Sequence, residues 1–182
     1  AAGRVHNVLA RIPGTTPGGP AVLLMAHYDG VWAGPSAADD AAATAALLDV
    51  ARLLRNERHA HDVILLLADG EESGLLGAAA FAREHRWAKG VSVVLNFEAR
   101  GVNGVSRMFE TGPGNLDVAR ELRKVPGVRA TSLSVTVYRM LPNDTDLSEM
   151  AVLNKPAMNF AFIGGVQRYH TAEDDPAHLD LG

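Results

Sequence analysis

Two short, uninterrupted apolar runs with one amphipathic helix between them constrain the fold of this chain more than any other feature. The runs occupy residues 22–25 and 63–67, and their apolar side chains do not alternate with polar ones. Such runs are typical of strands that are covered on both faces. Residues 41–55 place apolar side chains at helical spacing, with charged residues on the remaining faces. This order predicts a strand, a helix and a second strand as one unit.

The same alternation continues along the chain. We expect helices at residues 75–84 and 115–124, and strands at residues 91–97, 132–138 and 157–162. This order predicts an α/β fold, a three-layer sandwich whose mixed, mostly parallel central sheet carries helices on both faces. The length suits one catalytic domain over residues 1–182. Because the chain lacks an initiator Met and ends abruptly, we expect it to be a piece of a longer protein.

Composition excludes several kinds of function. The formal net charge is -4, and no cluster of Lys or Arg offers a surface for nucleic acid. The apolar stretches are far shorter than the roughly 20 residues that span a bilayer, so we expect no membrane span in this segment. Because the chain has no cysteine, it can form no disulfide, thiolate zinc site or cysteine nucleophile. Any metal must therefore be held by His, Asp and Glu.

Histidine and acidic residues gather where the predicted strands end or the first helix begins. They are His27, Asp29, Asp39, Asp40, Glu71, Glu72, Glu98 and His170. Each of them alone would be interpreted as an ordinary solvated turn residue. Together they lie where α/β sheets have their ligand sites, because the carboxyl ends of parallel strands share one edge. We therefore expect these residues to form a single site.

A cysteine-free zinc site must combine imidazole nitrogens with carboxylate oxygens. Two zinc ions about 3.5 to 4 Å apart also need a shared anionic bridge, which one carboxylate can provide. Each ion then needs one His and one further carboxylate, and a carboxylate that binds no metal must accept a proton from water. The chain has enough residues of each type at the predicted edge to meet these needs.

Five short strings resemble, in order and spacing, the M28 family of zinc peptidases. They are AHYD at 26–29, DD at 39–40, DGEESG at 69–74, NFE at 96–98 and YHT at 169–171, and the resemblance runs from about His6 to Asp180. Two more strings, FETGP at 109–113 and LPNDTD at 141–146, resemble the Fxna-like, or endoplasmic reticulum metallopeptidase, branch and its bacterial relatives.

The resemblance implies a role for each residue of the expected site. Two zinc ions would be held by His27 and Glu98, by Glu72 and His170, and by Asp39 as the bridge, with Glu71 as the general base. Asp29 would accept a hydrogen bond from the ring of His27 and fix its tautomer. The resemblance also implies a cis peptide bond between Asp39 and Asp40. In one departure, Glu98 stands where many aminopeptidases of the family have Asp.

Other candidates are less specific. Asp144 matches an acidic residue that the family places near the metals, and it could equally cap the helix that follows. Tyr138, Glu110 and Arg100 could contact the substrate or serve only in packing. By contrast, His59, His61 and Asp62 lie before the second strand, at the opposite end from the expected site, and we predict that they form a solvated loop.

The function that the resemblance implies is removal of the N-terminal residue from peptides with a free N-terminus. Two enzymatic alternatives remain: glutaminyl cyclisation with one zinc ion, and a carboxypeptidase, which would be distinguished by the charge of its pocket. A catalytically inactive binding ectodomain is the non-enzymatic alternative, although such relatives lose metal ligands. The sequence names no compartment; the resemblance implies flanking membrane spans and a lumenal or extracytoplasmic domain.

Overall fold

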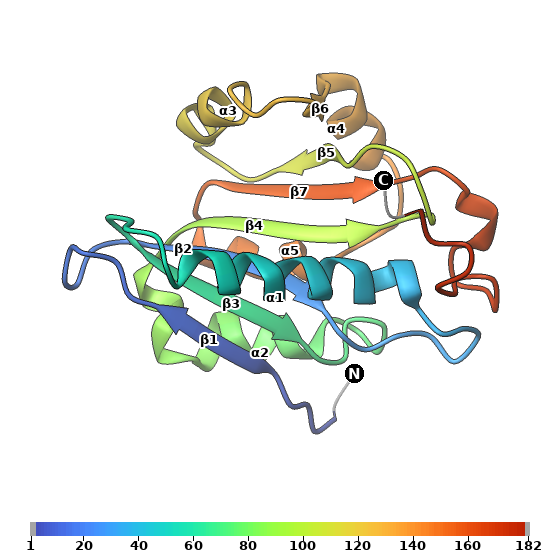
Figure 1. The fold of residues 1–182 in the computed structure, drawn as a ribbon, viewed down its shortest axis with the longest axis horizontal. Helices are drawn as coiled ribbons and strands as arrows, with labels where there is room; N and C mark the ends of the chain where they lie inside the picture. The colour runs from blue at the N-terminus through green and yellow to red at the C-terminus, as the bar shows by residue number, and fades with distance from the viewer. Residues whose placement is uncertain (1–2, 181–182) are drawn as a thin grey trace.

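The computed structural model describes residues 3–180, and its strands form one mixed sheet in the order β1-β3-β2-β4-β7-β5-β6 (Figure 1). The strands are β1 (Val8–Ile12), β2 (Ala21–His27), β3 (Asp62–Ala68), β4 (Val91–Ala99), β5 (Arg107–Thr111), β6 (Arg129–Ala130) and β7 (Ala157–Phe162). The four central strands, β3, β2, β4 and β7, are parallel, whereas β1 and β5 run antiparallel to their central neighbours. The predicted domain 1–182 extends past the described residues at both ends.

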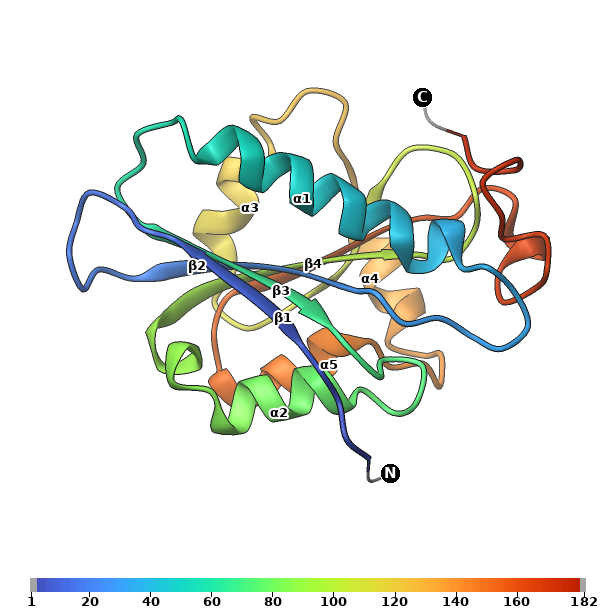
Figure 2. The ribbon, with the colours of Figure 1, turned by 60° about the horizontal axis from the view of Figure 1, so that its bottom comes forward.

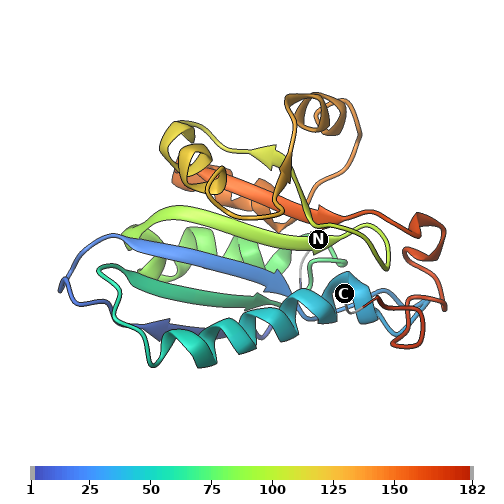
Figure 3. The same cartoon turned by 45° about the horizontal axis from the view of Figure 1, so that its top comes forward.

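Helices cover both faces of this sheet, as predicted. They are α1 (Ala43–Leu54), α2 (Leu76–Glu84), α3 (Leu116–Leu122), α4 (Ser132–Tyr138) and α5 (Asp146–Met150), with shorter helical turns at Ala37–Ala42, Arg86–Gly90, Ala151–Leu153 and Val166–Arg168. One face carries α1 and the other carries α2 and α5 (Figure 2). Helices α3 and α4 pack against β5 and β7, near the end of the sheet that β5 and β6 form (Figure 3). No helix within residues 3–180 is long and apolar enough to cross a membrane.

The central strands are mostly apolar because both of their faces are covered by helices. Leu23 and Leu66 pack toward α2, where Phe81 fills the same cluster. Their neighbour Leu65 points to the opposite face and packs with Leu47 of α1. A strand between two helical layers has no solvent side, so polar alternation disappears from its sequence. The polar residues of these four strands consequently lie at or near the strand ends, apart from the buried Asn96 and Asn159.

The strand predicted at residues 132–138 is wrong, because this segment is helix α4. The Thr131 hydroxyl caps the helix by accepting a hydrogen bond from the Ser134 backbone N–H at 3.0 Å. Leu133 and Val137 remain 69% and 48% exposed, and only Val135 of the alternating apolar residues packs into a core cluster. The period-two pattern therefore does not reflect a buried strand face. The sequence also gave no signal strong enough to predict the short strands β1, β5 and β6.

Asp62 differs from the solvated loop residue that we predicted. It begins β3 and is buried, and its carboxylate accepts hydrogen bonds from the Gly14 N–H and the Arg11 Nε, both at 2.7 Å. These two donors lower the pKa of Asp62 below its ordinary value. Asp62 thus ties the turn after β1 to the start of β3, away from the edge where the candidate site lies.

Replacing Asp62 by Asn should destabilise the fold in a pH-dependent way. The folded-state pKa lies below the unfolded value near 3.9, so the ionised carboxylate stabilises the fold above that pH and loses its effect as pH falls through the folded pKa. We expect Asp62→Asn to lower the free energy of unfolding by about 1 to 3 kcal/mol at pH 7 and progressively less below about pH 4. Urea unfolding in the presence of a chelator measures both values.

The matched control is Asp49→Asn, which removes an exposed ion pair with Arg52 on α1. It should change the free energy of unfolding by less than about 0.5 kcal/mol at either pH. An Asp62→Asn effect that stayed the same from pH 7 to pH 3 would contradict the assignment of this stability to the ionised carboxylate.

Candidate metal centre

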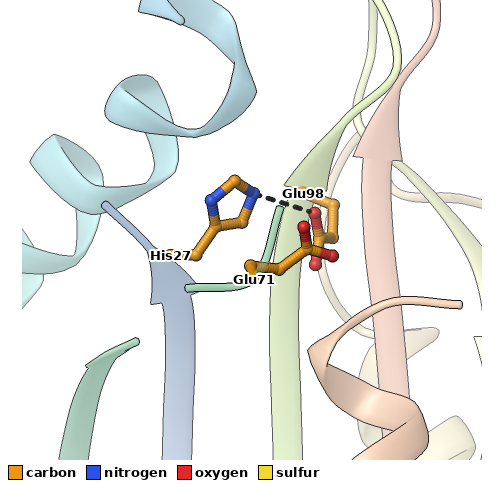
Figure 4. Close-up of side chains that lie close together, drawn as sticks. All are labelled: His27, Glu71 and Glu98. Atoms are coloured by element: carbon orange, nitrogen blue, oxygen red, sulfur yellow. Dashed lines mark ion pairs between the residues drawn. The ribbon is translucent and has the colours of Figure 1, made fainter. Parts of the chain in front are cut away.

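The predicted site residues come together at the carboxyl edge of the parallel strands. His27 is the last residue of β2, Glu98 is the penultimate residue of β4, and Glu71 lies in the turn after β3. Figure 4 shows these three side chains directed toward one another, although the three segments are far apart in the sequence. Asp39 lies in the turn before α1, and His170 follows β7. The parallel topology therefore brings the whole predicted set to one edge.

The carboxylate of Asp39 lies between two imidazole rings. Its Oδ1 is 3.3 Å from His27 Nε2, and its Oδ2 is 3.1 Å from His170 Nε2. Each ring nitrogen also faces a second carboxylate: His27 Nε2 is 3.6 Å from Glu98 Oε2, and His170 Nε2 is 2.9 Å from Glu72 Oε1. Two atoms bound to one tetrahedral zinc at about 2.1 Å lie about 3.4 Å apart. These separations fit two neighbouring zinc sites that share Asp39.

Burial makes this cluster a strong attractor for cations. His27 is 1% exposed and Asp39 is 3% exposed, and uncompensated carboxylates in such surroundings are costly. Burial alone would lower the pKa of His27, but the carboxylates around its ring outweigh it and hold that pKa well above its usual range. Burial, then the charge of Glu98, raises the pKa of Glu71 to about 9. Bound cations would reverse such proton uptake, because they stabilise the ionised carboxylates.

Asp39 is held in place by a residue that the sequence did not identify. The buried Asp174 accepts hydrogen bonds from the Ala38 N–H at 2.6 Å and from the Asp39 N–H at 3.2 Å. Asp39 has non-helical backbone angles, and its peptide bond to Asp40 is cis, as the resemblance implied. Asp174 thereby fixes the irregular turn that directs the Asp39 carboxylate toward the two imidazoles.

Asp29 contacts the ring of His27 as expected, although its backbone carbonyl, and not its carboxylate, makes the hydrogen bond. Its backbone carbonyl accepts the hydrogen bond from His27 Nδ1 at 3.0 Å, whereas its carboxylate Oδ1 is 3.6 Å from that nitrogen. The carboxylate instead accepts the backbone N–H groups of Glu71 and Glu72, at 3.0 and 3.2 Å. Asp29 therefore fixes both the turn after β3 and the tautomer of His27 that leaves Nε2 free to bind a metal.

A cavity of about 510 Å³ opens beside the cluster. Asp39, Glu71 and Glu98 lie on its wall at one end, and apolar side chains make up much of the remainder, among them Phe109, Leu133, Val137, Leu141, Ile163 and Val166. Of the four residues that the sequence suggested as possible substrate contacts or supports of the site, three line the cavity: Arg100, Tyr138 and Asp144. The fourth, Glu110, is not a lining residue, and it accepts a hydrogen bond from Asn159 at 3.0 Å.

The family model of peptidase family M28 matches residues 7–182, nearly the whole chain. This chain belongs to peptidase family M28. The resemblance on which the expected residue roles depend is thereby confirmed at the level of the family. Aminopeptidases of this family depend on zinc, and the imidazole and carboxylate donors at the carboxyl edge of the sheet suit that metal.

Among curated proteins, this M28 chain is 32% identical to endoplasmic reticulum metallopeptidase 1 of Homo sapiens, over 93% of the chain and 20% of that protein. It is also 32% identical to a vacuolar membrane protease of Candida dubliniensis, over 97% of the chain and 19% of that protein. The chain thus spans about a fifth of the length of the curated relatives that it matches.

Solved structures support the fold of the M28 chain. A zinc aminopeptidase from Bacillus subtilis superposes with a TM-score of 0.74 at 20% identity, covering 96% of this chain and 45% of that one. A glutaminyl cyclase from an Acidobacteriales bacterium gives a TM-score of 0.71 at 20% identity, covering 97% of this chain and 67% of that one. Because a peptidase and a cyclase share the architecture, the architecture alone does not determine the reaction.

Proposed function

We propose that this M28 chain is a di-zinc exopeptidase domain that removes the N-terminal residue from peptides. The observation that carries the proposal is the position of the Asp39 carboxylate, with one oxygen facing His27 and the other facing His170. One carboxylate between two imidazoles, each with a further carboxylate beside it, suits a pair of zinc ions better than a single ion. We assign His27 and Glu98 to one zinc ion, and Glu72 and His170 to the other.

Glu71 is proposed as the general base. It lies on the cavity wall beside His27 and Glu98, and its backbone is fixed by Asp29. Zinc, when bound, polarises the peptide carbonyl and makes a water molecule acidic enough to lose its proton near neutral pH. Glu71 accepts that proton and later donates it to the leaving amine, which requires a carboxylate that is not itself held by metal.

The cavity supplies the remaining requirement of an exopeptidase, a pocket for one terminal residue. Its volume of about 510 Å³ exceeds a single amino-acid side chain, and apolar residues dominate its walls at Phe109, Val137 and Ile163. An apolar N-terminal side chain would gain about 25 cal/mol of binding free energy for each Å² of its apolar surface that the cavity removes from water. We propose that the substrate's first residue occupies this cavity, with its peptide bond beside the metal cluster.

A carboxypeptidase is the second candidate, and one observation favours it. Arg100 lines the cavity, and among the residues that the structure describes no carboxylate lies within 4.0 Å of its guanidinium. Two neutral groups contact it: the Tyr169 ring, whose centroid is 4.7 Å from the guanidinium carbon, and the side-chain amide of Asn143. A guanidinium in this setting could bind the terminal carboxylate of a peptide.

The longer protein is proposed to be membrane-associated. The curated relatives named above are an endoplasmic reticulum metallopeptidase and a vacuolar membrane protease, and the chain covers only about a fifth of each. We propose that membrane spans flank this segment and that the domain faces the lumenal or extracytoplasmic side.

A panel of short peptides with blocked ends should decide between the two exopeptidase functions. The zinc-loaded protein is expected to hydrolyse peptides that have a free N-terminus and an amidated C-terminus, and to leave N-acetylated peptides intact. Product analysis by mass spectrometry identifies the released residue, and a chelator should abolish the reaction. Release of the C-terminal residue from N-acetylated peptides would establish the carboxypeptidase, and cyclisation of N-terminal glutamine without hydrolysis would establish the cyclase.

The neighbours Glu71 and Glu72 should respond differently to the same substitution. Glu71→Gln removes the base while keeping its shape, so it should retain two zinc equivalents and lower kcat by roughly 10² to 10⁴. Glu72→Gln should weaken one zinc equivalent, and excess zinc should partly restore its activity. Metal analysis and steady-state kinetics with and without added zinc measure both effects. Loss of metal and recovery with zinc in Glu71→Gln instead would reverse the two roles.

A further inference from the structure

A chain of buried side-chain hydrogen bonds leads from the candidate metal centre across the sheet. It begins at Glu98 on β4, passes through Asn96 and Asn159, and ends at Glu110 on β5 and Thr145 before α5. Both asparagines are 0% exposed, although they lie inside strands that are otherwise almost entirely apolar. Two amides in such an environment cost free energy unless their hydrogen bonds are made. Their positions therefore call for an explanation beyond packing.

The orientation of Asn159 is determined by its acceptors. Its Nδ2 donates to Glu110 Oε2 at 3.0 Å and to Thr145 Oγ1 at 2.8 Å, which uses both of its N–H groups. The amide oxygen must then point the other way, and it accepts a hydrogen bond from Asn96 Nδ2 at 3.1 Å. Asn159 thus presents only an acceptor to its neighbour on β4.

The orientation of Asn96 follows from that of Asn159. Its second N–H group donates to Glu98 Oε1 at 2.8 Å, while its own Oδ1 is buried with no hydrogen-bond partner among the described residues. Turning the amide over would set its oxygen against two acceptors, Asn159 Oδ1 and Glu98 Oε1. The unpaired oxygen is therefore the cost of directing both donors to these acceptors.

This contact divides the two oxygens of Glu98 between different partners. Oε1 is bound to the Asn96 amide, and Oε2 faces His27 Nε2 at 3.6 Å. A glutamate has one more rotatable bond than an aspartate, and the free side chain could offer either oxygen or both to a cation. Because Oε1 already accepts an N–H donor, Oε2 is the oxygen of Glu98 that is left free of a donor and faces His27.

We propose that Asn96, oriented by Asn159, is a positioning residue that makes Glu98 a single-oxygen zinc ligand, with Glu110 and Thr145 as the fixed end of the chain. The proposal rests on the function proposed above, because it concerns the same metal centre. It gives Glu110 a supporting role in place of the substrate contact considered from the sequence. It also accounts for how the longer Glu98 side chain is accommodated.

Zinc titration of the metal-free protein against a chromophoric chelator tests this proposal. Asn96→Leu keeps a similar volume and removes the donor, and it should weaken one of the two zinc equivalents by roughly 10- to 100-fold while leaving the other unchanged. Asn159→Leu should weaken the same equivalent by a smaller factor. The double variant should bind no more weakly than Asn96→Leu alone, because Asn159 acts through Asn96.

Ser92→Ala is the matched control, since Ser92 lies at the far end of β4 and its hydroxyl donates to the Ala21 carbonyl at 3.0 Å. It should leave both zinc equivalents unchanged. Urea unfolding of each metal-free variant reports folding separately, and Asn159→Leu serves as the test if Asn96→Leu fails to fold.

Wild-type affinity for both equivalents in folded Asn96→Leu or Asn159→Leu would overturn the proposal, as would equal weakening of both. These outcomes differ from failure of the proposed function itself, in which the wild-type protein would bind two zinc ions and hydrolyse no peptide, or would bind only one ion.

Discussion

The structure depends on one electrostatic constraint: several carboxylates and two imidazoles share a largely buried edge of the sheet, and their charges must be balanced. Asp39 is central, because each of its oxygens faces a different imidazole, at 3.3 Å for His27 and 3.1 Å for His170. Without a cation, proton uptake balances part of this charge: the Asp39 carboxylate raises the pKa of His170, and the carboxylates around His27 outweigh its burial and raise its pKa as well. Divalent cations offer the alternative on which the proposed chemistry depends.

The fold holds these acidic groups in place through hydrogen bonds from residues that do not themselves bind the metal in our assignment. Asp29 binds the backbone of the turn that carries the Glu71–Glu72 pair, and Asp174 binds the turn that carries Asp39. Asn96 holds one oxygen of Glu98. None of these three supporting residues has an oxygen or nitrogen assigned to zinc. The precision of the centre therefore comes from hydrogen bonds between segments that only the parallel sheet brings together.

The sequence predicted the parts of the fold whose physical cause is local. The continuous apolar runs identified β2 and β3, because a strand that is buried on both faces has no polar positions. The spacing of apolar residues identified α1, because a helix that is buried on one side repeats its apolar residues every three to four positions. The helix α4 was predicted as a strand, since its alternation of apolar and polar residues resembles a strand although only Val135 is packed in a core cluster. The edge strand β6 has two residues and is too short to leave a period at all.

In the candidate site, too, only the features with a local cause could be predicted from the sequence. Its histidines and acidic residues were found from their positions at strand ends and from the family strings, but their supports were not. Asp174 lies 135 residues from Asp39, and a contact at that separation leaves no trace in a single sequence. Asn96 and Asn159 did leave a signal, since each places an amide within a strand that is otherwise mostly apolar. The central claim is that Asp39 bridges two zinc ions, and anomalous diffraction at the zinc absorption edge tests it most directly. Crystals of the zinc-loaded protein should show two peaks about 3.5 to 4 Å apart with the Asp39 carboxylate between them; a single peak, or a pair that Asp39 does not join, would contradict the account.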